Sequence, residues 1–298
     1  GGETIGVIFP ILSRNRFAIC LRGIAKAVKK RFKDHKLILT DVEELDITNL
    51  EKVEEFVENA KPDVIINCAA YTAVDNAEDD VELARSINAL GPRNLAIAAN
   101  KNSAKLVHIS TDYVFPGNLP VDQVYTEDME PAPVSAYGRT KLVGEENAAK
   151  AEKYYILRTA WLYGLGGKNF VKTMLRLSQD RDELTVVDDQ HGSPTSTTTL
   201  CKIIEGIMEK EPAYGVYHST NEGFTTWCKF TRKIFEIANI STNVKAITSK
   251  EYKEMYPQSS DRPSNSQLSK EKLKNVGIIP EAWEVALEEY LKEELKEN

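Results

Sequence analysis

Two side chains with complementary acid–base chemistry, Tyr137 and Lys141, are four residues apart. Positions i and i+4 share one face of a helix, so a helix here places the phenol beside the ammonium. A phenol is a poor acid or base at neutral pH, because its usual pKa is about 10. An adjacent ammonium stabilises the phenolate, which allows proton transfer to a carbonyl that receives a hydride. Taken alone, this spacing favours an ordinary amphipathic surface helix.

The segment upstream supplies a third candidate for the same chemistry. Lys105–Ser110 has the pattern of an apolar strand, and the Ser110 and Thr111 hydroxyls lie where that strand ends and a loop begins. A hydroxyl at this point can hydrogen-bond a substrate oxygen, although a Ser-Thr-Asp run also forms simple turns and caps. The strand before it and the tyrosine helix after it favour the functional interpretation. The pattern therefore predicts that a hydroxyl of Ser110 or Thr111 acts together with Tyr137 and Lys141.

The scaffold for these residues is an alternation of strands and helices. Predicted strands are Thr4–Phe9, Lys36–Thr40, Asp63–Cys68, Lys105–Ser110 and Tyr154–Arg158, and predicted helices are Phe17–Phe32, Leu50–Ala60, Val81–Asn100 and Ser135–Lys150. Such alternation predicts an α/β fold with a doubly wound, Rossmann-like parallel sheet. The near-continuous apolar strands indicate that both faces of the sheet are covered. Folds of this type bind ligands at the carboxyl ends of the strands.

The pattern becomes less regular after Arg158. Short strands are expected at Leu184–Val187 and Gly215–His218, among helices at Asn169–Leu177, Thr197–Glu209, Thr226–Ala238 and Glu281 to the end. We predict a dinucleotide-binding core over residues 1–160. Residues 161–298 are expected to form mainly a smaller C-terminal substrate-binding part, with segments that return to the core.

Composition excludes several classes of protein. The 298 residues carry a net charge of −7, which argues against a nucleic-acid partner. The apolar stretch Ile5–Leu12 is too short to span a membrane and lacks the flanks of a signal peptide, so a cytoplasmic protein is expected. Cys20, Cys68, Cys201 and Cys228 form no CxxC pair and have no histidine at ligand spacing, so we predict buried thiols and no metal site.

Several motifs in one order resemble the dTDP-4-dehydrorhamnose reductases, a family of the extended short-chain dehydrogenase/reductase superfamily. The matching segments cover nearly the whole chain from about Lys36 onward: Asn67–Asp75, Ile87–Ala89, Ser110–Phe115, Ser135–Lys141, Arg158–Gly164, Asn169–Met174, Asp189–Thr195 and Arg262–Pro263. A set of motifs in a fixed order is more specific than any one of them.

The resemblance implies roles for individual residues. Thr111, Tyr137 and Lys141 would be catalytic, and Asp112, Tyr113 and Trp161 would join Thr111 in lining the sugar pocket. Cofactor contacts are expected from Asp46, Ile47, Ala69, Ala70, Thr72, Tyr137 and Lys141. Asp41 follows the second strand, where an acidic residue accepts the adenosine ribose hydroxyl and disfavours a 2′-phosphate. NADH or NADPH is therefore expected, with a slight preference for NADH.

The implied activity is reduction of the C4 ketone of dTDP-4-dehydro-L-rhamnose to dTDP-L-rhamnose. Similar dehydratases carry an Asp-Glu pair after the threonine, whereas Asp112 is followed here by Tyr113, so simple carbonyl reduction fits better. A related sugar-nucleotide reductase or epimerase is the alternative within the same class. Some similar enzymes use Mg²⁺, but the sequence contains no acidic cluster that we would assign to it.

One segment departs from the family pattern. Dinucleotide-binding folds need glycines in the first strand-to-helix turn, for a tight bend and a close approach to the pyrophosphate. Phe9–Phe17 contains none. A remodelled turn, a cofactor-free sugar-nucleotide-binding or regulatory protein, and an altered N-terminal sequence are the three alternatives.

Overall fold

The main sheet contains six parallel strands. In the computed structural model, which describes residues 4–8, 21–41 and 43–296, they are β1 (Thr4–Ile8), β2 (Lys36–Thr40), β3 (Val64–Asn67), β4 (Lys105–Thr111), β5 (Tyr154–Thr159) and β10 (Gly215–His218). Their order is β10-β5-β4-β3-β1-β2. The chain runs outward from β1 to β2 and then crosses back to β3 on the other side. The topological switch point therefore lies between β1 and β3, where such folds bind ligands.

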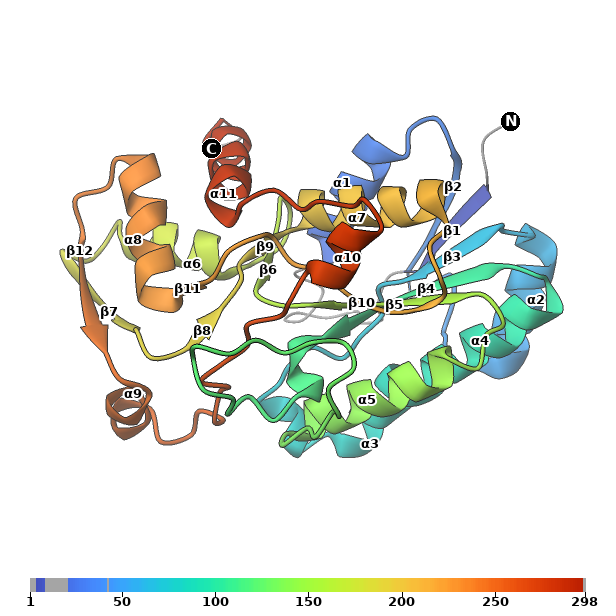
Figure 1. Ribbon diagram of the computed structural model, residues 1–298, viewed down its shortest axis with the longest axis horizontal. Helices are drawn as coiled ribbons and strands as arrows, with labels where there is room; N and C mark the ends of the chain where they lie inside the picture. Colours follow the sequence, from blue (N-terminus) through green and yellow to red (C-terminus); the bar gives the residue numbers. More distant parts are fainter. Residues whose placement is uncertain (1–3, 9–20, 42, 297–298) are drawn as a thin grey trace.

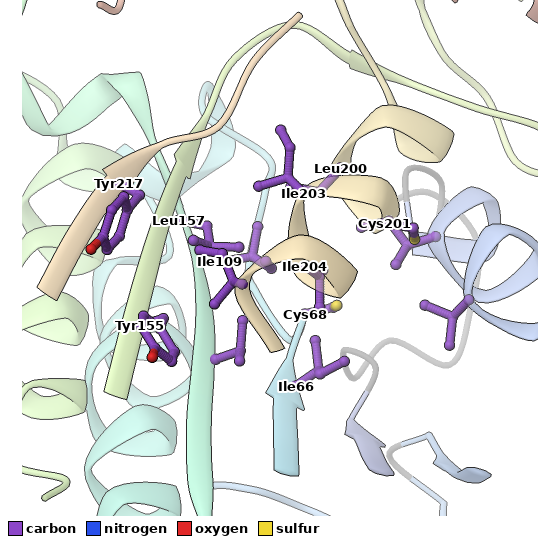
Figure 2. Close-up of a cluster of buried hydrophobic side chains, with 14 of the residues drawn as sticks. Ile66, Cys68, Ile109, Tyr155, Leu157, Leu200, Cys201, Ile203, Ile204 and Tyr217 are labelled. Atoms are coloured by element: carbon purple, nitrogen blue, oxygen red, sulfur yellow. The ribbon is translucent and has the colours of Figure 1, made fainter. Parts of the chain in front are cut away.

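Helices cover both faces of this sheet (Figure 1). One face carries α1 (Leu21–Arg31) and α7 (Thr197–Lys210), and the other carries α2 (Leu50–Ala60), α4 (Gly91–Lys101) and α5 (Ala136–Ala148). Leu200, Ile203 and Ile204 of α7 point toward the strand side chains Ile66, Ile109 and Leu157 (Figure 2). This arrangement confirms the predicted doubly wound α/β class, and it explains why the strands are apolar on both sides.

Side-chain caps fix where the site-bearing helices begin. The Ser135 hydroxyl accepts a hydrogen bond from the Gly138 N–H at the start of α5. Asn49 caps α2 and Ser196 caps α7 in the same way. Each cap satisfies a backbone donor that has no partner within its helix. The cap at Ser135 sets the position of Tyr137 in the first turn of α5.

The predicted single helix Val81–Asn100 needs a correction. The chain is helical from α3 (Val81–Arg85) to α4, but Ser86–Leu90 forms a π-helical turn between them. That wider turn directs Asn88 inward, where its side chain bonds the Tyr71 backbone N–H (2.8 Å), the Tyr71 carbonyl (3.2 Å) and the Thr140 hydroxyl (3.0 Å). The π turn thus connects the loop after β3 to α5, as such turns often do near functional sites.

The C-terminal part packs beside the carboxyl edge of the main sheet (Figure 1). Its strands are β6 (Leu162–Tyr163), β7 (Glu183–Val187), β8 (His191–Gly192), β9 (Thr195–Ser196), β11 (Thr225–Thr226) and β12 (Asn243–Ile247). Its helices are α6 (Phe170–Leu177), α8 (Trp227–Ala238), α9 (Ser249–Met255), α10 (Glu271–Asn275) and α11 (Trp283–Glu294). β7 and β12 pair in parallel, and α6, α8 and α11 enclose a separate apolar cluster.

Three elements of the later sequence pack in or on the main sheet. β10, which the sequence pattern grouped with the smaller part, pairs in parallel with β5, α7 packs against α1, and α10 packs against β10. The crossover through α7 buries Leu200, Ile203 and Ile204, which explains this placement. No described helix combines the length and the apolar character needed to cross a membrane.

Candidate active site

The predicted site residues gather along the carboxyl edge of the main sheet. Asp41 follows β2, Ala69 follows β3, and Thr111 ends β4. Because all six strands are parallel, their carboxyl ends share one edge. Asp41, Ala69 and Thr111, which are far apart in the sequence, therefore lie along the same edge of the sheet.

The end of β4 holds Thr111 in a defined orientation. Its hydroxyl oxygen accepts a hydrogen bond from the Tyr113 N–H (3.2 Å) and donates one to Asp112 Oδ1 (3.0 Å). Asp112 is buried, and its Oδ2 has no hydrogen-bond partner among the described residues. Burial raises the pKa of Asp112 to about 6 and outweighs the hydrogen bond from Thr111, which acts in the opposite direction. The Thr111 hydroxyl and the Asp112 carboxylate are therefore bonded to each other at the end of β4.

Helix α5 places Tyr137 and Lys141 next to this turn. The Tyr137 ring packs edge-on against Tyr113, with the ring centroids 5.5 Å apart. Lys141 is 2% exposed, and its Nζ donates to the Ile109 carbonyl (2.7 Å). Burial lowers the pKa of Lys141 to about 8, while Glu145 and Cys68 oppose that shift. A lysine in this state can gain or lose its proton near neutral pH.

A glycine, Gly138, lets α5 approach the turn after β4. A Cβ on Gly138 would lie 2.3 Å from the Tyr113 carbonyl oxygen. No side chain fits at that distance, so glycine is required for the contact. The result is that Thr111, Tyr113 and Tyr137 form one packed unit.

A cleft of about 870 Å³ opens between the sheet edge and the C-terminal part. That volume lies within the usual range for small-molecule sites. The predicted substrate residues Asp112, Tyr113 and Trp161 all line it. Thr111, Tyr137 and Lys141 do not line it, but the Thr111 hydroxyl bonds Asp112 and the Tyr113 N–H, and the Tyr137 ring packs against the Tyr113 ring.

One wall of the cleft is aromatic. Trp161 stacks on Trp227, with ring centroids 3.6 Å apart and an interplanar angle of 15°, and Phe170 packs against Trp227 at 4.5 Å. Trp161 has a φ of +48°, which an L-residue adopts only when its surroundings hold it there. A Cβ on Gly192 would lie 2.8 Å from the indole, so this glycine leaves room for Trp161. Sequence reasoning missed Trp227 and Phe170, because the stack forms only in three dimensions.

Another part of the cleft carries charged side chains of both signs, with Glu254 and Asp261 among the basic residues. Arg262 bonds both carboxylate oxygens of Asp75 (2.9 and 3.0 Å) and donates to the Tyr113 hydroxyl (3.1 Å). Lys250 and Lys253 line the same cleft. The sequence marked Arg262 and Asp75 only as parts of matching motifs. No local pattern indicates an ion pair between residues this far apart in the chain.

The predicted cofactor residues lie at the ends of β2 and β3. Asp46 accepts hydrogen bonds from the Thr48 backbone (2.9 Å) and hydroxyl (2.7 Å), and the Ala69 N–H donates to Asn67 Oδ1 (2.9 Å). Ile47 is fully buried against α4, whereas Ala70 and Thr72 follow β3 at the edge. Their cofactor roles stay predictions.

One group at the end of β2 fits a ribose hydroxyl. The buried Thr40 hydroxyl, beside Asp41, has no hydrogen-bond partner among the described residues. The Asp41 carboxylate can accept a hydrogen bond from a ribose hydroxyl, and the Thr40 hydroxyl can donate or accept one. The glycine-poor turn Phe9–Phe17 lies outside the described residues.

The described residues form no evident metal-binding site. Among those residues, no three His, Cys, Asp or Glu side chains gather closely enough to hold a metal ion. Cys68, Cys201 and Cys228 are buried free thiols.

A Rossmann-like sheet, with a Tyr-Lys helix beside a cleft of nucleotide-sugar size, defines a reductase of the extended short-chain dehydrogenase/reductase class. Residues 23–296 match the family described as the RmlD substrate binding domain. The dTDP-4-dehydrorhamnose reductase of Escherichia coli K12 is 40% identical over 260 residues, which cover 83% of this chain and 85% of that protein.

Two further relatives agree with this assignment. The spore coat polysaccharide biosynthesis protein SpsK of Bacillus subtilis 168 is 38% identical over 250 residues, covering 84% of this chain and 86% of SpsK. The crystal structure of dTDP-4-dehydrorhamnose reductase from Bacillus anthracis in complex with NADP is 37% identical, covers 98% of this chain and 100% of that chain, and has a TM-score of 0.89. The chain belongs to the dTDP-4-dehydrorhamnose reductase (RmlD) family.

Proposed function

We propose that this protein reduces the C4 ketone of dTDP-4-dehydro-L-rhamnose to dTDP-L-rhamnose with a nicotinamide cofactor. The observation that carries the proposal is the packed unit of Thr111, Tyr113 and Tyr137 beside the cleft, with Lys141 one helical turn further along α5. Family membership supplies the substrate class, through the E. coli and B. anthracis reductases.

The residues divide the reaction among them. Tyr137 protonates the alkoxide that forms at C4, and the Lys141 ammonium stabilises the phenolate that remains. Asp112 and Thr111 orient the sugar through the carboxylate and the hydroxyl, which bond each other at the end of β4. When bound, the nicotinamide supplies the hydride. Trp161, stacked on Trp227, forms an apolar wall that excludes water from one side of the sugar.

The cleft also divides by chemistry in a way that suits a nucleotide sugar. The polar end at Asp112 suits the hexose, and Lys250 and Arg262 supply positive charge for the diphosphate, beside the acidic Glu254 and Asp261.

Cofactor choice is a separate part of the proposal. The carboxylate of Asp41 favours NADH, because it would repel the 2′-phosphate of NADPH. The B. anthracis relative carries NADP, so the comparison gives no support for that preference. We propose that either nicotinamide can serve, and kcat/KM with each cofactor measures the preference.

A coupled experiment tests the function. The purified chain is given dTDP-4-dehydro-L-rhamnose with NADH or NADPH, and both nicotinamide oxidation and the sugar product are followed. Tyr137→Phe should lower turnover by about 10²–10⁴-fold, the usual scale for a positioned acid. Cofactor affinity, measured by nicotinamide fluorescence, should stay near that of the unchanged protein. Unimpaired turnover in this variant would remove Tyr137 from the reaction.

The nicotinamide fluorescence titration also distinguishes the alternative functions that the sequence left open. A cofactor-free binding or regulatory protein would bind neither nicotinamide at millimolar concentration. A related reductase or epimerase would bind cofactor but act on another sugar nucleotide, which a panel of dTDP- and UDP-sugars would reveal.

A further inference from the structure

A buried carboxylate on α5 lies one turn beyond the Tyr-Lys pair. Tyr137, Lys141 and Glu145 are spaced four residues apart, so they lie in sequence along one face of the helix. Glu145 is 4% exposed. A buried charge needs close partners, since isolated burial is costly.

Glu145 has two such partners, on different strands. Its Oε1 accepts from the Ser110 hydroxyl (2.6 Å) and from Arg158 Nε (2.9 Å), and its Oε2 accepts from the second Arg158 nitrogen (2.7 Å). The Arg158 guanidinium is also buried, 5.0 Å above the Phe115 ring. The carboxylate thereby ties α5 to β4 and β5, next to Thr111.

Stability alone is a weak reason for such a pair. Replacing a buried ion pair with apolar residues of similar size is often neutral or stabilising. We therefore infer that the Glu145–Arg158 pair has a role toward a neighbouring group. The neighbour with chemistry to perform is Lys141.

Cys68 after β3, His108 and the Ile109 carbonyl on β4, and Glu145 on α5 are the groups that act on Lys141. Tyr137 lies four residues before it on the same helix, and Arg158 on β5 is connected to it through Glu145. Burial raises the pKa of Cys68 to about 12 and holds that of His108 well below its ordinary value, so both are neutral near pH 7. Glu145 is then the anion that acts on Lys141 among the described residues.

We propose that Glu145 is a positioning residue for the reductase reaction, which keeps Lys141 in its ammonium form and holds the end of β4 against α5. Arg158 tempers this effect, because its cation partly cancels the Glu145 charge. The inference rests on the proposed function for its catalytic meaning, but the electrostatic relationship can be measured without substrate.

A double-mutant cycle that removes the charges of Glu145 and Arg158, measured in the cofactor-free protein, tests the proposal. The ionisation of Lys141 is followed by NMR of ¹³C-labelled lysine, with its signal assigned from its loss in Lys141→Met. Glu145→Gln should lower the apparent pKa of Lys141 by about one unit, since it removes an attracting charge. Arg158→Gln should raise that pKa, and Glu145→Gln/Arg158→Gln should lie between the two single variants.

The decisive result is that the two single variants shift the Lys141 pKa in opposite directions. General loosening of the site would shift this pKa in the same direction in both variants. Shifts of the same sign, or no shift, would overturn the proposal. If Glu145→Gln fails to fold by circular dichroism, Arg158→Gln is compared with the double variant, which must have the lower Lys141 pKa. Absence of reductase activity in the unchanged protein would reject the proposed function and leave this measurement intact.

Discussion

The Lys141 ammonium donates a 2.7 Å hydrogen bond to the carbonyl of Ile109, two residues before Thr111. This bond fixes the lysine against β4, and burial lowers its pKa to about 8. The ammonium form is the one that assists Tyr137, so kcat should fall about tenfold per pH unit above pH 8. A pH–rate profile measures this. Lys141→Arg, which stays charged, should have lower turnover but no fall above pH 8.

The same lysine should affect folding in a defined direction. Its folded pKa of about 8 lies below the ordinary value of 10.5, so between these pH values the unfolded chain binds more protons than the folded protein. The free energy of unfolding from this residue should therefore rise with pH across that window. Urea unfolding at several pH values should reveal the slope, and Lys141→Met should reduce it. An unchanged slope in Lys141→Met would mean that another group is responsible.

Asp112 should control substrate affinity on the acidic side. Its pKa of about 6 means that the carboxylate, which accepts from Thr111, is protonated as the pH falls below 6. We expect KM for the sugar nucleotide to rise below pH 6. Asp112→Asn should raise KM by about 10- to 100-fold, the scale of a hydrogen bond to a charged group, and should remove that acidic rise. A KM that stays pH-dependent in Asp112→Asn would contradict the assignment.

The sequence predicted the sheet strands well because each is a short apolar run between turn residues. It predicted Tyr137 and Lys141 because their spacing is local to one helix. The π turn escaped prediction, since Asn88 gains its partners only when Tyr71 and Thr140 are brought beside it. Arg262, Trp227 and Glu145 escaped for the same reason: each meets its partner across elements that are distant in the chain.

The aromatic wall depends on a missing side chain at Gly192. A Cβ there would lie 2.8 Å from the Trp161 indole, which must then move from its stack on Trp227. Gly192→Ala should raise KM by about tenfold through the displaced ring, with kcat changed less. Gly206→Ala, on α7 outside the cleft, is the matched control and should leave KM unchanged. Equal KM values in the two variants would show that Trp161 does not shape the substrate site.

Gly144 makes the tightest backbone contact between α5 and the π turn. A Cβ on Gly144 would lie 2.0 Å from the Asn88 carbonyl oxygen, so an alanine must push the two backbones apart. The helix preference of alanine over glycine is worth only about 0.5–1 kcal/mol. Overpacking of this kind costs about 1–3 kcal/mol or more, so the clash should dominate.

Gly144→Ala should therefore lower the free energy of unfolding, as measured by urea denaturation. Val143→Ala, at an exposed position on the same helix, should change it by less than about 0.5 kcal/mol. The displaced π turn should also weaken the hydrogen bonds of Asn88 to Tyr71 and Thr140. These bonds hold the loop after β3 at the carboxyl edge of the main sheet, where the cofactor is proposed to bind. Weaker nicotinamide binding should accompany the lost stability, whereas a stable variant with normal binding would argue against this close approach of α5.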